Sequence, residues 1–415
     1  MSPRLGSNPA GLESSTALNA GAPAPRQHFG DRRQPNDTWM EKSTPSRSRR
    51  TRYLVIGALT VAIIAAIGIA LGVTLSKKHS SSASSGSSSG SGSSVVNETN
   101  GDPSNFEKNP ALKQSFYGLA YTPEGSQLPE CGNTLAGVIT DIQLISQLTT
   151  RIRLYGADCN QTELVLEAIK QTKVNVSVVV ANYPISTDGG AAYTRQAIEL
   201  EQAITAYGTN NIIGMTVGNE FILDYLGDNG GGQDPNSAVA NTGAQMLIGF
   251  INDTKKMLAN MSVSIPVGNS DAGAYFNNLV LADVSYGLAN VHPWFANVSI
   301  DQAAGWTWDF FTGTDVALAN TLANKPTMSI AETGWPSNAT DAGSDSNGPS
   351  LATEANLQTF LDTFLCQANT NGTEYYFFEV FDEPWKGAQF GGVEGYWGLF
   401  YANKTLKGIT IPDCS

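Results

Sequence analysis

Two glutamates follow short apolar runs in the sequence and are candidates for acid–base chemistry. Glu220 ends the segment IIGMTVGNE, directly after Asn219, and Glu332 ends TMSIAE, three residues before Trp335. Glycoside hydrolysis needs one carboxyl group that is protonated, to supply the leaving oxygen with H⁺, and one that is ionised, to attack the sugar or activate water. The alternative is that each glutamate lies on a solvated loop. The pair predicts hydrolysis only if the fold brings the two groups together.

The elements that would position them are eight strand–helix units. Short β-branched or aromatic runs occupy 116–121, 150–155, 174–181, 212–217, 263–268, 284–289, 327–332 and 375–380, and helix-like segments between them include 136–147, 161–171, 191–207, 240–259 and 352–369. This alternation predicts an α/β fold, a (β/α)8 TIM barrel, over 115–415. A doubly wound sheet is the alternative, but no GxGxxG or GxxxxGK[ST] motif follows any run. Active sites lie at the C-terminal ends of barrel strands, where Glu220 and Glu332 would converge.

Six segments, two of which contain Glu220 and Glu332, carry recognisable motifs in a fixed order: GLAYTP (118–123), RIRLYGADC (151–159), VGNE (217–220), VHPWF (291–295), AETGWPS (331–337) and FFEVFDEPWK (377–386). Together they resemble the signature segments of glycoside hydrolase family 17, the β-1,3-glucanases of plants and fungi, and look closer to the fungal members. The resemblance implies a (β/α)8 barrel and a retaining mechanism without a metal or organic cofactor. It also implies that Glu220 is the general acid/base and Glu332 the nucleophile.

Other residues near the predicted strand ends are candidates for substrate binding. Asn219 is placed to hydrogen-bond a sugar 2-OH, and Arg153 could keep Glu332 ionised, with a structural salt bridge as the alternative reading of that arginine. His292 stands where plant family members carry a tyrosine, and is a candidate donor to the nucleophile. By the resemblance Glu383 and Lys386 lie in the site, and Asp271 is a weaker candidate. Aromatic side chains could stack on sugar rings or simply pack in the core, and the candidates are Tyr121, Tyr155, Tyr183, Trp294, Trp335 and Trp385.

Charge is distributed unevenly along the 415 residues, whose formal net charge is −13. Residues 1–52 carry nine Lys/Arg and four Asp/Glu, so +5, and the remainder carries 15 − 33 = −18. An acidic protein lacks the basic surface that nucleic-acid binding requires, so no nucleic-acid partner is expected. A neutral glucan needs no charge for its attraction.

An apolar segment separates the basic and acidic parts. Residues 53–75 contain no ionisable side chain other than a tyrosine and are long enough to cross a bilayer, which predicts a transmembrane signal-anchor helix. Arginines crowd its N-terminal edge, so 1–52 is expected to be a disordered cytoplasmic tail and the rest to be exported. Residues 76–114, with a Ser/Gly-rich stretch, read as a flexible linker. This arrangement predicts a single-pass type II protein of the plasma membrane with its barrel facing the cell wall, or shed into the wall after cleavage of the linker.

Cysteines and glycosylation sequons are consistent with export. All four cysteines follow the apolar segment and are disulfide candidates with three possible pairings: Cys131, Cys159, Cys366 and Cys414. Nine N-x-S/T sequons also follow it, at Asn97, Asn160, Asn175, Asn252, Asn260, Asn297, Asn338, Asn371 and Asn403. No Cys/His spacing indicates a metal site.

Three functions are compatible with these features. The first is endo-hydrolysis of β-1,3-glucan in the cell wall, by a monomer, during wall remodelling. The second is a β-1,3-glucanosyltransferase, which uses the same covalent intermediate but passes it to a second glucan. The third is a catalytically silent glucan-binding wall sensor, against which the presence of both glutamates argues.

Overall fold

Eight parallel strands form a closed barrel in the computed structural model, which describes residues 101–414. Each strand pairs with its neighbours in sequence, and β8 closes the barrel on β1. The strands are β1 (Gly118–Ala120), β2 (Arg151–Arg153), β3 (Ser177–Asn182), β4 (Ile212–Val217), β5 (Val267–Ala272), β6 (Tyr286–Asn290), β7 (Thr327–Thr333) and β8 (Tyr375–Phe377). The predicted (β/α)8 barrel is therefore confirmed, and the doubly wound alternative is wrong.

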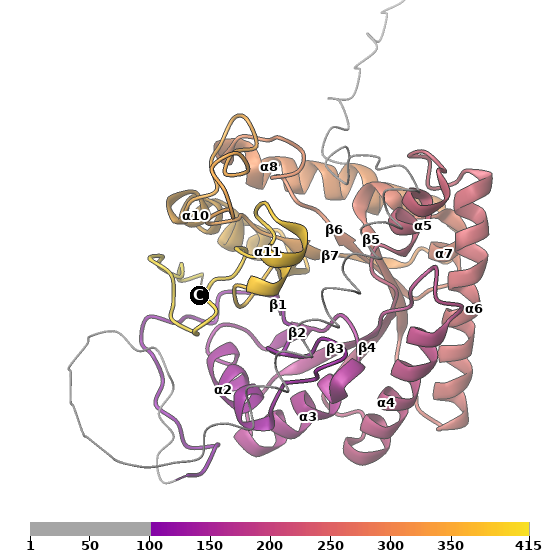
Figure 1. The fold of residues 1–415 in the computed structure, drawn as a ribbon, viewed down its shortest axis with the longest axis horizontal. Coiled ribbons are helices and arrows are strands. Elements are labelled where there is room, and N and C mark those ends of the chain that lie inside the picture. The colour runs from indigo at the N-terminus through magenta and orange to yellow at the C-terminus, as the bar shows by residue number, and fades with distance from the viewer. Residues whose placement is uncertain (1–100, 415) are drawn as a thin grey trace, which may run out of the picture. The chain divides into compact units, whose positions relative to one another are not determined.

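Helices lie between successive strands and surround the barrel (Figure 1). They are α2 (Leu135–Ile145), α3 (Gln161–Thr172), α4 (Ala191–Tyr207), α5 (Phe221–Asn229), α6 (Ala238–Asn260), α7 (Asn278–Ala282), α8 (Ile300–Phe310), α9 (Ala317–Thr321), α10 (Glu354–Thr370) and α11 (Pro384–Phe390). A π-helical turn over Phe311–Val316 joins α8 to α9. The five helical segments singled out in the sequence correspond to α2, α3, α4, α6 and α10.

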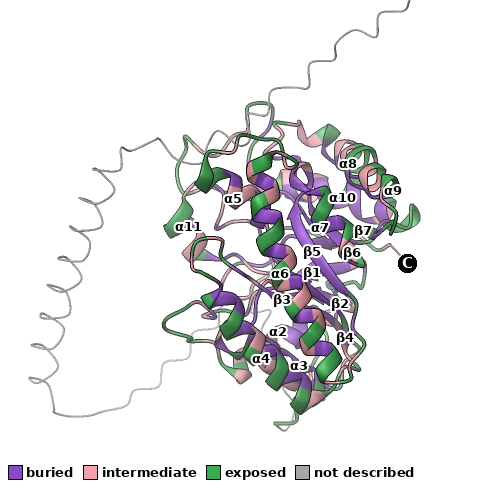
Figure 2. Cartoon of the chain, turned by 90° about the vertical axis from the view of Figure 1, so that its right-hand side faces the viewer, coloured by how far each residue is buried: buried purple, intermediate pink, exposed green. Residues whose placement is uncertain are grey.

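The strands are coloured mostly as buried in Figure 2. They are buried because the helices cover their outer faces and because side chains fill the barrel. In β3, for example, Val178, Val179 and Val180 are consecutive and all buried, as expected for a strand covered on both faces. Helix α6 instead buries one stripe, which includes Leu247, Ile251 and Leu258 at helical spacing. The two periodicities explain why the sequence pattern separates strands from helices.

The fifth strand differs from its prediction. The apolar run at 263–268 predicts a strand there, whereas β5 spans Val267–Ala272. Polar residues make up its middle, and their hydrogen bonds replace apolar contacts inside the barrel: the side-chain amide of Asn269 donates to the Val217 carbonyl at 2.9 Å, and Asp271 accepts from the Ile222 amide at 2.9 Å. A criterion based on apolar runs misses such a strand.

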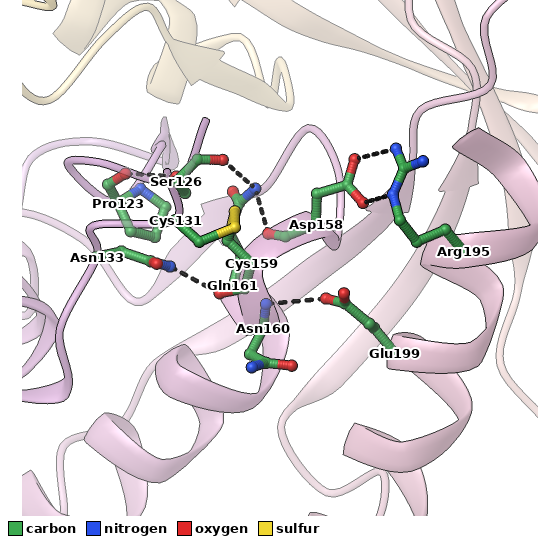
Figure 3. Close-up of a disulfide and its surroundings, with 10 residues drawn as sticks. All are labelled: Pro123, Ser126, Cys131, Asn133, Asp158, Cys159, Asn160, Gln161, Arg195 and Glu199. Carbon is green, nitrogen blue, oxygen red and sulfur yellow. Dashed lines mark hydrogen bonds and ion pairs between the residues drawn. A yellow bond between two sulfur atoms is a disulfide. The ribbon is translucent and has the colours of Figure 1, made fainter. Parts of the chain in front are cut away.

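The four cysteines form two disulfides, which is one of the three possible pairings. Cys131 bonds to Cys159, and Cys366 bonds to Cys414. The first bridge joins the loop after β1 to the loop after β2 (Figure 3). Beside it the Arg195 guanidinium forms an ion pair with Asp158, the residue before Cys159. The bridge fixes the loop after β2 to the loop after β1, and the ion pair fixes it to α4, on the face of the barrel where the strands end.

The predicted tail, transmembrane helix and most of the linker lie outside the described residues, as does the sequon at Asn97. Between residues 101 and 414, no helix is long and apolar enough to span a membrane. Within the same range, the Asn252 side chain is half-buried and the other predicted sequon asparagines are exposed: Asn160, Asn175, Asn260, Asn297, Asn338, Asn371 and Asn403.

Candidate active site

Glu220 and Glu332 line one cavity of about 630 Å³ at the C-terminal ends of the strands. Glu220 directly precedes α5 and adopts a left-handed backbone conformation with φ 55°. This conformation is rare for a residue with a side chain and is typical of functional sites. Glu332 lies within β7, where 6% of its surface is exposed. The fold thus brings together the two carboxyl groups that the sequence analysis singled out.

Glu332 is held ionised by two donors, one at each carboxylate oxygen. Arg153 Nη1 lies 2.9 Å from Oε1, and His292 Nε2 lies 3.0 Å from Oε2. Burial alone would raise the pKa of Glu332, but the hydrogen bond from His292 and the positive charge of Arg153 outweigh it and lower the pKa to about 2. The contacts predicted between Glu332 and both Arg153 and His292 are therefore present.

Glu220 is in the opposite state. Burial and then the negative charge of Glu332 raise its pKa to about 8, against a hydrogen bond from Asn290 Nδ2 to Oε1 at 3.0 Å. Near neutral pH Glu220 is therefore protonated and Glu332 ionised. This is the division between a general acid and a nucleophile.

Asn219 connects the surroundings of the two glutamates. Its Oδ1 accepts hydrogen bonds from Arg153 Nη2 at 2.7 Å, Ser270 Oγ at 3.2 Å and Asn290 Nδ2 at 3.3 Å. With Oδ1 so used, the Asn219 amide nitrogen remains as a donor, as its predicted contact with a sugar hydroxyl requires. The sequence analysis did not select Asn290. Its signal in the sequence is its position at the end of the sixth strand, where polar side chains can reach the site.

The aromatic candidates divide into two groups. Tyr155 packs against Arg153, with its ring centroid 4.4 Å from the guanidinium carbon. Burial and the negative charge of Glu332 raise the pKa of Tyr155. Tyr121, Trp294 and Trp335 are not among the residues that line the cavity, and their part in substrate binding stays a prediction. The hydroxyl of Tyr121 donates to Asp141 at 2.8 Å, while Trp335 is fully buried and packs edge to face on Trp294. The packing of these three with the core explains why they are not among the lining residues.

Other aromatic residues form the cavity wall, and the sequence analysis did not select them as platforms. They are Phe295, Trp306, Phe310, Phe378 and Trp397, together with the carboxyl-bearing Glu394. Trp306 and Phe310 stack at 5.0 Å on one face of α8. Their spacing of four residues is a detectable signal, but nothing in the sequence tells which face of that helix meets the cavity.

Glu383 and Lys386 lie next to this wall and are not among its lining residues. Lys386 Nζ forms ion pairs with Glu379 at 2.8 Å and Glu383 at 2.7 Å, and it lies 4.6 Å from the ring centroid of Phe378. The cluster therefore supports Phe378, which does line the cavity. The Asp271 carboxylate accepts a hydrogen bond from the Ile222 backbone amide, and so holds the start of α5. Tyr183 lines a small neighbouring cavity of about 120 Å³ that shares Asp224 with the main one.

No group of three His, Cys, Asp or Glu side chains in the described part of the chain could hold a metal ion. The polar side chains that line the cavity carry carboxyl, amide and imidazole groups; among them Asn290 bonds to Glu220, and His292 to Glu332. This composition is suited to proton transfer and nucleophilic attack on a polyhydroxylated molecule.

A barrel with a carboxyl pair at the ends of β4 and β7 is an architecture of glycoside hydrolases, and the comparison with known proteins agrees. The chain belongs to the BtgE/BtgC glycoside hydrolase domain family, whose model matches residues 118–398. A btgC protein of Aspergillus niger is 37% identical over 323 residues, covering 74% of this chain and 45% of that protein. The glucan endo-1,3-beta-glucosidase btgC of Emericella nidulans is 36% identical over 397 residues, covering 90% of this chain and 59% of that protein. The chain thus spans about half the length of the curated relatives it matches.

The fold is also similar to that of a solved enzyme. The crystal structure of a glycoside hydrolase family 17 β-1,3-glucanosyltransferase from Rhizomucor miehei superposes with a TM-score of 0.58 at 24% identity. The match covers 73% of this chain and 100% of that structure. It supports the barrel architecture for the described domain.

Proposed function

We propose that this protein hydrolyses internal β-1,3-glucosidic bonds of cell-wall β-glucan with retention of configuration. The observation that carries the proposal is that Glu220 and Glu332 line one cavity, where Arg153 and His292 hold the Glu332 carboxylate and lower its pKa to about 2, while burial and the charge of Glu332 raise the pKa of Glu220 to about 8. The names of the Aspergillus and Emericella relatives point to the β-1,3-glucan linkage. A retaining pair is expected to lie about 5–5.5 Å apart, too close for an intervening water.

In the first step, Glu332 attacks the anomeric carbon of the glucosyl unit and Glu220 gives its proton to the departing glycosidic oxygen. The bond between carbon and the leaving glucan breaks as the bond to the Glu332 carboxylate forms. Arg153 and His292 orient the attacking carboxylate by holding one oxygen each. In this proposal the Asn219 amide donates to the sugar 2-OH, a contact that strengthens in the oxocarbenium-like transition state.

In the second step, Glu220 is ionised and takes a proton from water, which attacks the anomeric carbon and releases Glu332. A hydroxyl of a second glucan can take the place of water, and the enzyme would then be a glucanosyltransferase. The similarity of fold to the Rhizomucor enzyme keeps this second candidate open. A silent glucan-binding sensor is disfavoured because binding alone would not require two carboxyl groups with opposite pKa shifts.

The test is digestion of laminarin and of laminari-oligosaccharides by the full chain, with the products separated by size. Hydrolysis predicts a rise in reducing ends and products shorter than each oligosaccharide. Products longer than the substrate would favour transfer over hydrolysis. Absence of any cleavage, with the folded barrel verified by circular dichroism, would contradict both enzymatic proposals.

We further propose that residues 53–75 anchor the protein in the plasma membrane and place the barrel on the wall side. The support is the uncharged apolar segment and the arginines that precede it. The protein should remain in the membrane pellet after alkaline carbonate extraction. Recovery of the full-length chain in the soluble fraction would contradict the anchor, whereas a shortened chain in the medium would indicate shedding.

A further inference from the structure

An exposed pair of aromatic rings lies on α11, the helix that follows β8 at the catalytic face. Phe390 is 62% exposed, the most exposed large hydrophobic side chain among residues 101–414, and Trp385 is half-buried. Their ring centroids are 6.2 Å apart in an edge-to-face arrangement. These two rings, called the α11 ledge below, account for none of the chemistry described above.

The ledge is continuous with the wall of the catalytic cavity. Lys386 connects the two: its Nζ lies 4.6 Å from the ring centroid of Phe378, which lines the cavity, and 5.8 Å from that of Trp385. The segment directly after the helix returns to the cavity and contributes Glu394 and Trp397 to its lining.

The helix and that returning segment also pack closely. A Cβ atom at Gly395 would lie 3.1 Å from the Gly387 nitrogen, closer than most side chains approach, so the two backbones are in near contact. Helix α11, which carries the ledge, and the segment 391–397, which lines the catalytic cavity through Glu394 and Trp397, therefore form one packed unit beside the cavity.

We propose that the α11 ledge is a remote binding surface for the β-1,3-glucan chain where it leaves the catalytic cavity. This inference rests on the proposed function. Sugar rings present apolar C–H faces, for which exposed aromatic rings are suitable partners, and no charge is needed to attract a neutral glucan. The occupant is the same polysaccharide that is cleaved, because the ledge continues the wall of the cleavage cavity. Its contribution should appear only with substrates long enough to reach from the cavity to α11.

The experiment measures the ratio of kcat/KM on laminarin to kcat/KM on the shortest laminari-oligosaccharide that the protein cleaves. Phe390→Ala, whose ring is largely in solvent, is the first variant because its loss leaves little packing to disturb, and Trp385→Ala is the second. We expect the ratio to fall about tenfold in each, which corresponds to about 1.4 kcal/mol. Trp308→Ala is the matched control, since Trp308 is 38% exposed on α8 and does not line the cavity, and it should leave the ratio unchanged.

The outcomes separate the two proposals. An unchanged ratio in both ledge variants, with laminarin still cleaved, would overturn the ledge and leave the proposed function standing. Failure of the unsubstituted protein to cleave either substrate would instead overturn the proposed function. If Phe390→Ala left the ratio unchanged but altered the sedimentation of the protein, the ledge would be a contact between protein chains, and glucan binding there would be wrong.

Discussion

The imidazole of His292 and the guanidinium of Arg153 hold opposite oxygens of the Glu332 carboxylate, at 3.0 Å and 2.9 Å. The side chain of Arg153 is 1% exposed, and that of His292 is 11% exposed. Because both donors favour the ionised form, the nucleophile stays charged although it is buried. The aromatic rings around His292, which include Phe378 and Trp397, fix the imidazole in place.

Replacing His292 should therefore change the acid limb of the pH profile. In His292→Ala the ionised form of Glu332 loses a hydrogen bond, so its pKa rises above about 2 and the acid limb of kcat/KM moves to higher pH. His292→Gln, whose amide can still donate, should show a smaller shift. Identical acid limbs in the parent protein and in His292→Ala would show that this contact does not control the nucleophile.

The alkaline limb should report the general acid. With a pKa of about 8, Glu220 loses its proton as the pH rises through that value, so kcat/KM should fall above about pH 8. Glu220→Gln should lower kcat by about 10²–10⁴-fold for natural glucan and remove this limb. For a substrate with a good leaving group, which needs no proton in the first step, kcat/KM should fall much less, whereas kcat should still fall because Glu220 is also the base of the second step. An equal loss of kcat/KM with both kinds of substrate would contradict the assignment.

A substitution of Asp224 should change the pKa of Glu220. This residue lines the cavity on α5, and its negative charge is one of the causes that raise the pKa of Glu220. Asp224→Asn should lower that pKa and move the alkaline limb to lower pH by roughly half a unit, equivalent to about 0.7 kcal/mol. Asp253→Asn, on the exposed side of α6, is the control with the same change of charge. A limb that moves equally in both variants would indicate a general effect of net charge.

The disulfides should contribute to stability independently of catalysis. Cys131–Cys159 closes a loop with a sequence separation of 28, for which the chain-entropy relation gives about 3–4 kcal/mol. The double variant Cys131→Ser, Cys159→Ser should therefore lower Tm in a thermal melt. Because this bridge fixes loops at the catalytic face, KM should also change, whereas loss of Cys366–Cys414, between α10 and the C-terminal segment, should lower Tm only. Equal effects on KM would contradict this distinction.

The sequence was sufficient to predict the barrel and the two glutamates. The alternation of apolar runs and helical segments predicts the strand–helix units. Because the C-terminal ends of the barrel strands meet at one face, the sequence also predicts that Glu220 and Glu332 lie close together. The fifth strand was misplaced because Asn269 and Asp271 satisfy their polar groups inside the barrel, which an apolar pattern does not reveal.

The aromatic wall was the least predictable part. Tyr121 and Trp335 follow strands just as site residues do, but their polar atoms bond to Asp141 and to the Leu351 carbonyl, and their rings are buried away from the cavity. Which side of a loop faces the cavity depends on packing between segments that are distant in sequence. For the same reason the walls supplied by α8 and by residues 391–397 could not be located from residue types alone.

The most direct test of the central claim is covalent labelling of the nucleophile. An activated 2-deoxy-2-fluoro laminaribioside reacts readily to form the covalent glycosyl-enzyme, which then hydrolyses slowly. The intermediate can therefore be digested, and the masses of its peptides can be measured by mass spectrometry. If Glu332 is the nucleophile, the peptide that contains it should carry one added 2-deoxy-2-fluoro-laminaribiosyl group, and no peptide of Glu332→Gln should carry one. A label on another residue, or turnover of the reagent without any covalent adduct, would contradict the assignment of Glu332 as nucleophile of a retaining pair.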